Sequence, residues 1–70
     1  METVTIETEY IRLDALLKLA GLVDTGGQAK FVIQNGQVTV NGGPCTQRGK
    51  KLRPGDKAAY EGRQIQVQSA

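Results

Sequence analysis

Apolar and polar positions follow two different periods along this chain. Residues 3–7 alternate polar and apolar side chains and are rich in β-branched residues, which predicts a short strand with one buried face. The period then becomes helical, with apolar side chains at Leu13, Leu16, Leu17 and Ala20. This spacing predicts a short helix that ends at Gly21 in a left-handed backbone, after which Leu22 packs back on Leu17.

A second helix has a clearer start in the sequence. Thr25 and Gln28 have the spacing of a capping box, in which both side chains satisfy backbone groups at the helix start. Gly36 ends the helix. Gly26 and Gly27 each cost its first turn roughly 1 kcal/mol relative to alanine, so we expect another reason for them, such as close approach of a partner's backbone. The apolar face consists of Ala29, Val32 and Ile33.

The remainder of the chain is typical of strands and turns. Residues 37–40 alternate and lead into the Asn41-Gly42 turn signal. Residues 51–56 place proline before glycine, the order that a type II turn favours. Two further strands, joined through residues 61–63, contain Ala58 and Tyr60, then Ile65 and Val67. The order of elements predicts an α+β fold, with two short helices on a small, mainly antiparallel sheet.

The length and the composition narrow the function classes. Seventy residues suffice for one domain, which we expect over residues 1–70. A chain of this size buries only about 60% of its unfolded surface, so a deep catalytic cleft would be hard to house. Histidine is absent and Cys45 is the only cysteine, so we expect no disulfide, metal or cofactor. No apolar run suits a membrane helix and the acidic start does not suit a signal peptide, so we expect a cytoplasmic protein.

The net charge of +2 conceals an uneven distribution. Residues 1–14 carry a net charge of −3, residues 15–35 carry +1, and residues 36–70 carry +4. The densest positive segment contains Arg48, Lys50, Lys51 and Arg53. Such a cluster is either a solvated loop or a surface for phosphates, which attract clustered cations and release counterions on binding.

Four segments in this order and spacing resemble the S4-type RNA-binding domain, also called the alpha-L motif. They are residues 12–14, residues 28–30, the run GQVTVNG at residues 36–42 and the run KLRPGD at residues 51–56. The chain is most similar to small stand-alone bacterial members, over residues 11–67. The resemblance implies an alpha-L fold that binds structured RNA, ribosomal RNA first and transfer RNA second, without catalytic residues. We expect a monomer with no membrane and no small-molecule substrate.

The resemblance also implies which residues face the RNA. Arg12 and Lys30 match family positions on the RNA-facing side, and Lys18 is included as a further candidate. Gly26 and Gly27 stand where many relatives carry arginine, a departure that removes a phosphate contact. They form either a plain loop-to-helix transition or a seat for a phosphate at the helix N-terminus. The candidate RNA-binding residues are Arg12, Lys18, Gly26, Gly27, Gln28, Lys30, Phe31, Asn41, Arg48, Lys50, Lys51 and Arg53.

Several residues have two interpretations in the sequence. Phe31 falls on the helix side opposite the apolar face, where it either packs on a neighbouring segment or offers a stacking platform for an unpaired base. Asn41 is expected mainly to form its turn and, as a secondary role, to contact RNA. Cys45 has no nearby base and is not expected to be catalytic. The aspartates at 14, 24 and 56 lack metal-ligand spacing and suit caps and turns.

Two rival functions come from other classes. A protein-interaction adaptor could dock on an acidic partner through the same basic cluster. A β-grasp-like carrier domain shares similar turns, but a sulfur carrier requires a C-terminal Gly-Gly, and this chain ends in Gln68-Ser69-Ala70. The sequence therefore favours RNA binding over both.

Overall fold

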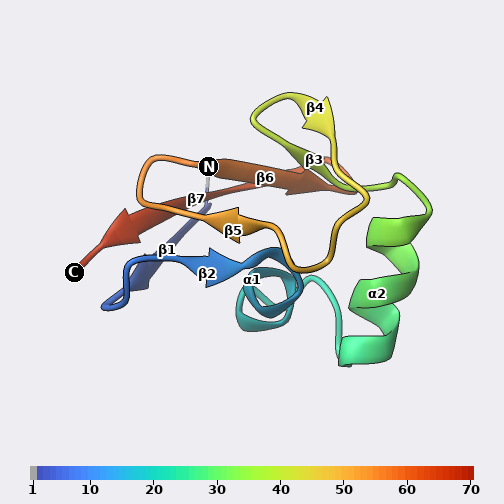
Figure 1. Ribbon diagram of the computed structural model, residues 1–70, viewed down its shortest axis with the longest axis horizontal. Coiled ribbons are helices and arrows are strands. Elements are labelled where there is room, and N and C mark those ends of the chain that lie inside the picture. Colours follow the sequence, from blue (N-terminus) through green and yellow to red (C-terminus); the bar gives the residue numbers. More distant parts are fainter. Residues whose placement is uncertain (1) are drawn as a thin grey trace.

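Two short helices pack on a mainly antiparallel sheet in the computed structural model, which describes residues 2–70 (Figure 1). The five-stranded sheet has the order β1-β7-β6-β3-β4, and β2 and β5 form a separate antiparallel pair. This arrangement confirms the predicted α+β class. The elements in chain order are β1 (Glu2–Ile6), β2 (Ile11–Arg12), α1 (Leu13–Leu19), α2 (Gly26–Gln34), β3 (Thr39–Val40), β4 (Gly43–Pro44), β5 (Lys51–Leu52), β6 (Lys57–Tyr60) and β7 (Arg63–Ser69).

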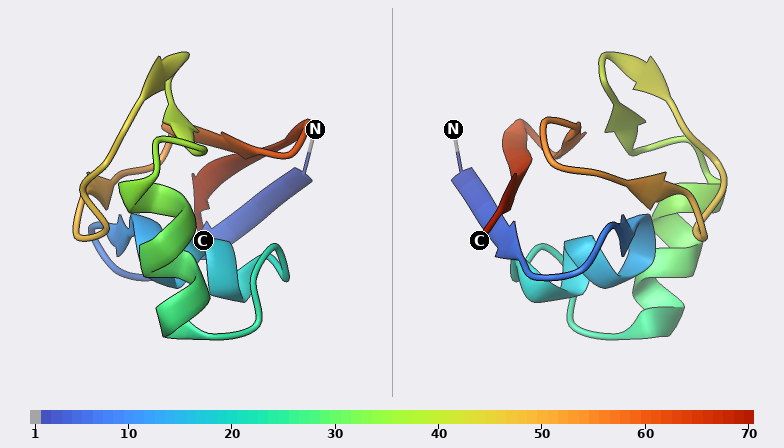
Figure 2. Two further views of the ribbon diagram at one scale, coloured as in Figure 1. Left: turned by 90° about the vertical axis from the view of Figure 1, so that its right-hand side faces the viewer. Right: turned by 60° about the vertical axis from the view of Figure 1, so that its left-hand side comes forward.

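The core lies between the helices and the sheet, as the two apolar faces predict. Both helices bury the leucines, valine, isoleucine and alanine that recur at helical spacing, and Ile65 and Val67 of β7 are fully buried. Ala20 and Leu22 are partly buried and pack against this cluster. Figure 2 shows the helices on one side of the molecule and the strands β6 and β7 on the other. The fully buried side chains of the helices are Leu13, Leu16, Leu17, Ala29 and Ile33.

Helix α1 ends and helix α2 begins at the residues that the sequence predicts. Gly21 has a φ of 75°, and the Leu22 amide donates to the Leu17 carbonyl over 2.9 Å. At the start of α2, the Gln28 amide donates to the Thr25 hydroxyl over 3.0 Å. The Gln28 side chain accepts from the Asp24 amide rather than from that of Thr25, so the capping box reaches one residue further back than expected.

The turns between strands are also as predicted, while one strand is shorter. Asn41 and Gly42 have φ values of 51° and 86°, as a tight hairpin turn requires. Gly55 has a φ of 98° beside an Asp56 amide that donates to the Arg53 carbonyl, as in a type II turn. The strand predicted over residues 37–40 is reduced to β3 because the Gln37 amide donates to the Val32 carbonyl and closes α2.

Strand β1 pairs in parallel with β7 along its whole length. An ion pair between Glu2 and Arg63 joins the two strands, with the Arg63 Nε 2.7 Å from a Glu2 carboxylate oxygen. The hydrogen bond from Arg63 lowers the pKa of Glu2. The charge of Arg63 is therefore balanced at the sheet edge and is separate from the basic cluster. No helix within residues 2–70 is long and apolar enough to cross a membrane.

Candidate RNA-binding surface

The start of α1 is closed by a distant loop instead of by a capping side chain. Arg12 stands at the N-cap position and makes no capping hydrogen bond. The Leu13 amide donates to the Lys50 carbonyl over 2.8 Å, and the Asp14 amide donates to the Arg48 carbonyl over 3.1 Å. These bonds hold residues 45–50, called here the basic loop, against the helix. The two carbonyls supply acceptors for amides at the start of α1 that have no partner within the helix. The loop conformation and the start of α1 therefore stabilise each other.

Strand pairing places two cations side by side at the same point. Arg12 of β2 pairs with Lys51 of β5, and Ile11 pairs with Leu52. Leu52 is fully buried, so the alternation of side chains along the strand turns Lys51 outward. The Lys51 ammonium lies 4.8 Å from the centroid of the Tyr10 ring, a cation–π contact. The sequence does not identify Tyr10 as a candidate, because its proximity to Lys51 depends on a pairing between segments about forty residues apart.

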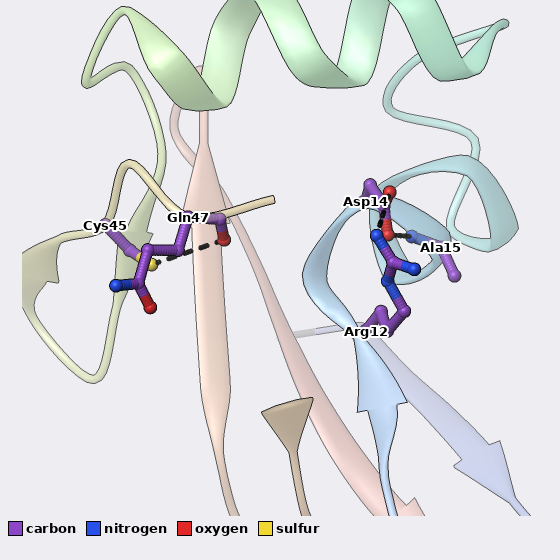
Figure 3. A network of polar contacts seen from close by, with 5 residues as sticks. All are labelled: Arg12, Asp14, Ala15, Cys45 and Gln47. Atoms are coloured by element: carbon purple, nitrogen blue, oxygen red, sulfur yellow. Dashed lines mark hydrogen bonds and ion pairs between the residues drawn. The ribbon is translucent and has the colours of Figure 1, made fainter. Parts of the chain in front are cut away.

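The guanidinium of Arg12 is oriented by a neighbouring carboxylate (Figure 3). Its Nη2 lies 3.2 Å from Oδ2 of Asp14, while Oδ1 of Asp14 accepts from the Ala15 amide over 2.8 Å. A β-carbon placed on Gly49 of the basic loop would lie 3.6 Å from the same nitrogen. The Arg12 side chain is half exposed. It therefore lies alongside the basic loop with part of its donor fork still open to solvent.

A shallow depression joins the two helices beside Arg12. It is lined by Arg12, Asp14, Ala15, Lys18 and Gly26. Lys30 follows Gly26 by one helical turn and lies on the same side of α2. Candidates from β2, α1 and α2 are thus parts of one continuous surface.

Most of the candidate cations have no carboxylate partner among the residues that the structure describes. Within residues 2–70, the only ion pairs join Arg12 to Asp14 and Arg63 to Glu2. The remaining candidates are exposed and lie more than 4 Å from any described carboxylate oxygen. They therefore leave a positive surface for a polyanion. These unpaired cations are Lys18, Lys30, Arg48, Lys50, Lys51 and Arg53.

Two candidates have structural roles. The Asn41 side chain donates to Asp56 over 3.2 Å and accepts from the Lys57 amide over 3.0 Å, so it links two turns. Gln28 is used in the helix cap. Asp14 and Asp56 also bond backbone amides, as the cap and turn interpretation predicts. These contacts favour the turn interpretation of Asn41.

Phe31 and the glycine pair are open to solvent. The Phe31 side chain is 64% exposed, so the interpretation that it packs on a neighbouring helix or loop is wrong. A β-carbon at Gly26 would meet no atom within 4 Å, and one at Gly27 would meet only the Thr25 hydroxyl at 3.9 Å. Neither glycine has a positive φ. The fold itself therefore does not require glycine at these positions.

Comparison with known proteins identifies relatives over nearly the whole chain. The chain is 42% identical over 59 residues to the probable ribosome maturation protein RlbA of Bacillus subtilis, covering 84% of this chain and 83% of RlbA. It is 38% identical over 58 residues to the putative RNA-binding protein YbcJ of Escherichia coli, covering 83% of each.

Comparison of the fold with solved structures identifies the same group of proteins. The solution structure of E. coli YbcJ, described as revealing an alpha-L motif involved in RNA-binding, superimposes with a TM-score of 0.74 at 35% identity and covers 97% of this chain and 87% of that one. A family model, the S4 domain, matches residues 4–68. Sequence, fold and surface agree, and the chain belongs to the S4 domain family.

Proposed function

We propose that this protein binds structured ribosomal RNA, without catalysis, through the surface formed by the basic loop, the start of α1 and the exposed side of α2. The chain is an RNA-binding protein of the S4 domain family, and YbcJ, which shares its fold, contains a motif involved in RNA-binding. Ribosomal RNA is favoured over transfer RNA by the similarity to a probable ribosome maturation protein.

One observation supports this proposal above the others. The carbonyls of Arg48 and Lys50 accept hydrogen bonds from the start of α1, so the cations of the basic loop are held beside Arg12 rather than free to spread apart. A preformed set of cations loses less conformational entropy when it meets a row of phosphates. The wide, shallow minor groove of A-form RNA presents phosphates and 2′-hydroxyls to such a surface, which reads shape rather than sequence.

The relatives and the surface together suggest a setting. We place the protein in the cytoplasm as a monomer that associates with ribosomal RNA during ribosome maturation or translation. The surface is shallow and consists of cations and backbone groups, which suits binding rather than bond cleavage.

The salt dependence of binding tests the proposal directly. With roughly four phosphate contacts, the affinity for ribosomal RNA should fall about a hundredfold between 50 and 200 mM salt, as the release of counterions predicts. Filter retention measures this, with transfer RNA as competitor. Absence of binding at the lower salt concentration would contradict the proposal, and equal competition by transfer RNA would remove the preference for ribosomal RNA.

A charge variant locates the surface. We predict that Lys50→Gln together with Lys51→Gln lowers the slope of log affinity against log salt by about two, because two phosphate contacts are lost. The backbone bonds of the basic loop and of β5 do not involve these side-chain charges, and the lost contact of Lys51 with the exposed Tyr10 ring contributes only about 0.5–1 kcal/mol. The melting temperature should therefore fall by no more than a few degrees.

The matched control changes the net charge by the same amount at a different place on the surface. Gln64→Glu with Gln68→Glu alters two exposed positions of β7, away from the basic loop, and also lowers the net charge by two. This control should leave the slope nearly unchanged. Equal losses in the two variants would mean that overall charge, rather than this surface, drives binding.

A further inference from the structure

We infer that Phe31 is a stacking platform for a single unpaired base, so that the preferred RNA is a helix with an unpaired nucleotide beside it. This inference rests on the proposed function and specifies its substrate. The phenylalanine ring is the most exposed large hydrophobic side chain of residues 2–70, at 64%. It contributes nothing to the core, because Ala29, Val32 and Ile33 fill the opposite side of α2.

The neighbouring residues of α2 leave the ring uncovered. Helical side chains lean toward the N-terminus, so the ring of Phe31 extends over the turn that contains Gly27 and Gln28. Gly27 has no side chain, and the Gln28 side chain is bonded back to the Asp24 amide. A residue with a side chain at position 27 would fit the fold, since a β-carbon there meets only one atom at 3.9 Å. The glycine therefore keeps the ring face accessible where the fold does not require glycine.

The position of the ring relative to the cations specifies the partner. With about 100° between successive helical residues, Gly26 faces the depression shared with Arg12 and Lys18, Lys30 comes next around α2, and Phe31 follows. Figure 1 places α2 at the outer end of the molecule, with α1 between it and β1. A phosphate backbone that follows the cations from the depression over Lys30 thus arrives beside the ring. An unpaired base at that point presents a π-face to it, whereas the bases of a continuous helix are already stacked.

The test compares two RNA hairpins with the same stem, one continuous and one carrying a single unpaired 2-aminopurine. Stacking on an aromatic ring lowers the fluorescence of this base. We expect the wild type to bind the second hairpin about five- to a hundredfold more tightly, the range that base–aromatic stacking supports, and to quench its fluorescence. Phe31→Ala should lose both the preference and the quenching, while binding the continuous hairpin with the affinity and salt dependence of the wild type.

Three further variants separate stacking from other causes. Phe31→Tyr keeps the π-face and should keep the preference, whereas Phe31→Leu keeps apolar volume and should lose it. Leu19→Ala is the matched control, because Leu19 is 63% exposed on α1 and carries no ring. It should behave like the wild type. Thermal melting of Phe31→Ala should match the wild type within a few degrees, as expected for an exposed side chain.

Each other outcome overturns the inference in a recognisable way. Equal wild-type affinity for the two hairpins, with binding still dependent on Lys50 and Lys51, would leave RNA binding in place and remove the stacking site. A retained preference in Phe31→Ala, or a large fall in its melting temperature with unchanged preference, would assign the ring another role. Failure of the wild type to bind either hairpin would contradict the proposed function, and the inference with it.

Discussion

Asn41 occupies a left-handed backbone conformation, with a φ of 51°, and both ends of its amide are bonded within the fold. The side chain joins the β3–β4 turn to Asp56 and to the start of β6. An asparagine is suited to this place because it tolerates positive φ and carries both a donor and an acceptor. In the sequence, the same residue type at a turn is equally compatible with contact to RNA.

We predict that Asn41→Ala lowers the free energy of unfolding by about 1–3 kcal/mol, because it removes two hydrogen bonds and puts a β-carbon into the left-handed region. Asn41→Gly removes the hydrogen bonds alone and should cost less. Urea unfolding at neutral pH measures both. RNA affinity of the folded variants should be unchanged, and a stable variant with weakened binding would instead make Asn41 an RNA contact.

At the scale of the element, α2 combines a firm cap with a first turn of low helix propensity. Thr25 and Gln28 close its N-terminus by side-chain bonds, yet the next two residues are glycine. Within residues 2–70, the backbone amides of Gly26 and Gly27 donate no hydrogen bond. The turn thus keeps open backbone donors beside the depression that Arg12 and Lys18 line.

We predict that Gly26→Ala and Gly27→Ala each raise the stability of the protein but lower its affinity for RNA. Each should raise the free energy of unfolding by up to about 1 kcal/mol, because alanine favours the helix and the β-carbon has room. RNA affinity should fall, since the β-carbons hold a phosphate away from the amides.

Gly36→Ala is the contrasting control for this pair. Gly36 has a φ of 74°, so the same substitution there should destabilise the protein by about 1 kcal/mol or more. Chemical unfolding and filter retention on the same samples separate the two effects. If RNA affinity is unchanged in the stabilised variants, the glycines are a plain loop-to-helix transition.

The elements that the sequence predicts correctly are those determined by local signals. Both helices follow from the leucine spacing and the Thr25 cap, and the turns at Asn41-Gly42 and Pro54-Gly55 follow from residues that accept positive φ. The sequence does not predict the two-residue pair β2–β5 or the parallel pair β1–β7, because each joins segments about forty or more residues apart. Such pairings carry no local sequence signal beyond alternation.

The same distinction applies to the candidate surface. The cationic residues could be chosen from charge clustering and from the family resemblance. Their arrangement could not, because it depends on the Leu13 amide finding the Lys50 carbonyl and on Lys51 lying against Tyr10. Exposure of Phe31 was one of two predicted alternatives, and the packed core decides between them. Position along a helix fixes which side a residue faces, while tertiary packing fixes what covers it.

At the scale of the whole molecule, a 70-residue chain has a small core, so single polar links between segments make up a large share of its net stability. Asp56 is one such link. Its carboxylate accepts from the Arg53 amide over 2.8 Å and from Asn41 over 3.2 Å, and its backbone pairs with Val67 of β7. The Arg53 hydrogen bond, with smaller contributions from Asn41, Lys50 and Arg53 charge, lowers the pKa of Asp56.

The lowered pKa of Asp56 means that its charged form stabilises the folded state at neutral pH. An aspartate in the unfolded chain has a pKa of about 3.9, and the folded value lies below it, so the folded state binds the proton less readily. The stabilisation is therefore fully present above about pH 5 and is lost as the pH falls through the folded pKa. Asp56→Asn should be less stable than the wild type at pH 7, and the difference should vanish toward pH 2.

Urea unfolding at several pH values measures this difference. Glu9→Gln, at an exposed carboxylate with no hydrogen bond among residues 2–70, should retain the acid sensitivity of the wild type. The acid sensitivity that persists in Asp56→Asn should include the ion pair between Glu2 and Arg63, since the pKa of Glu2 is also lowered. A constant difference between the wild type and Asp56→Asn from pH 7 to pH 2 would mean that Asp56 acts through its shape and its hydrogen bonds, with no contribution from its charge.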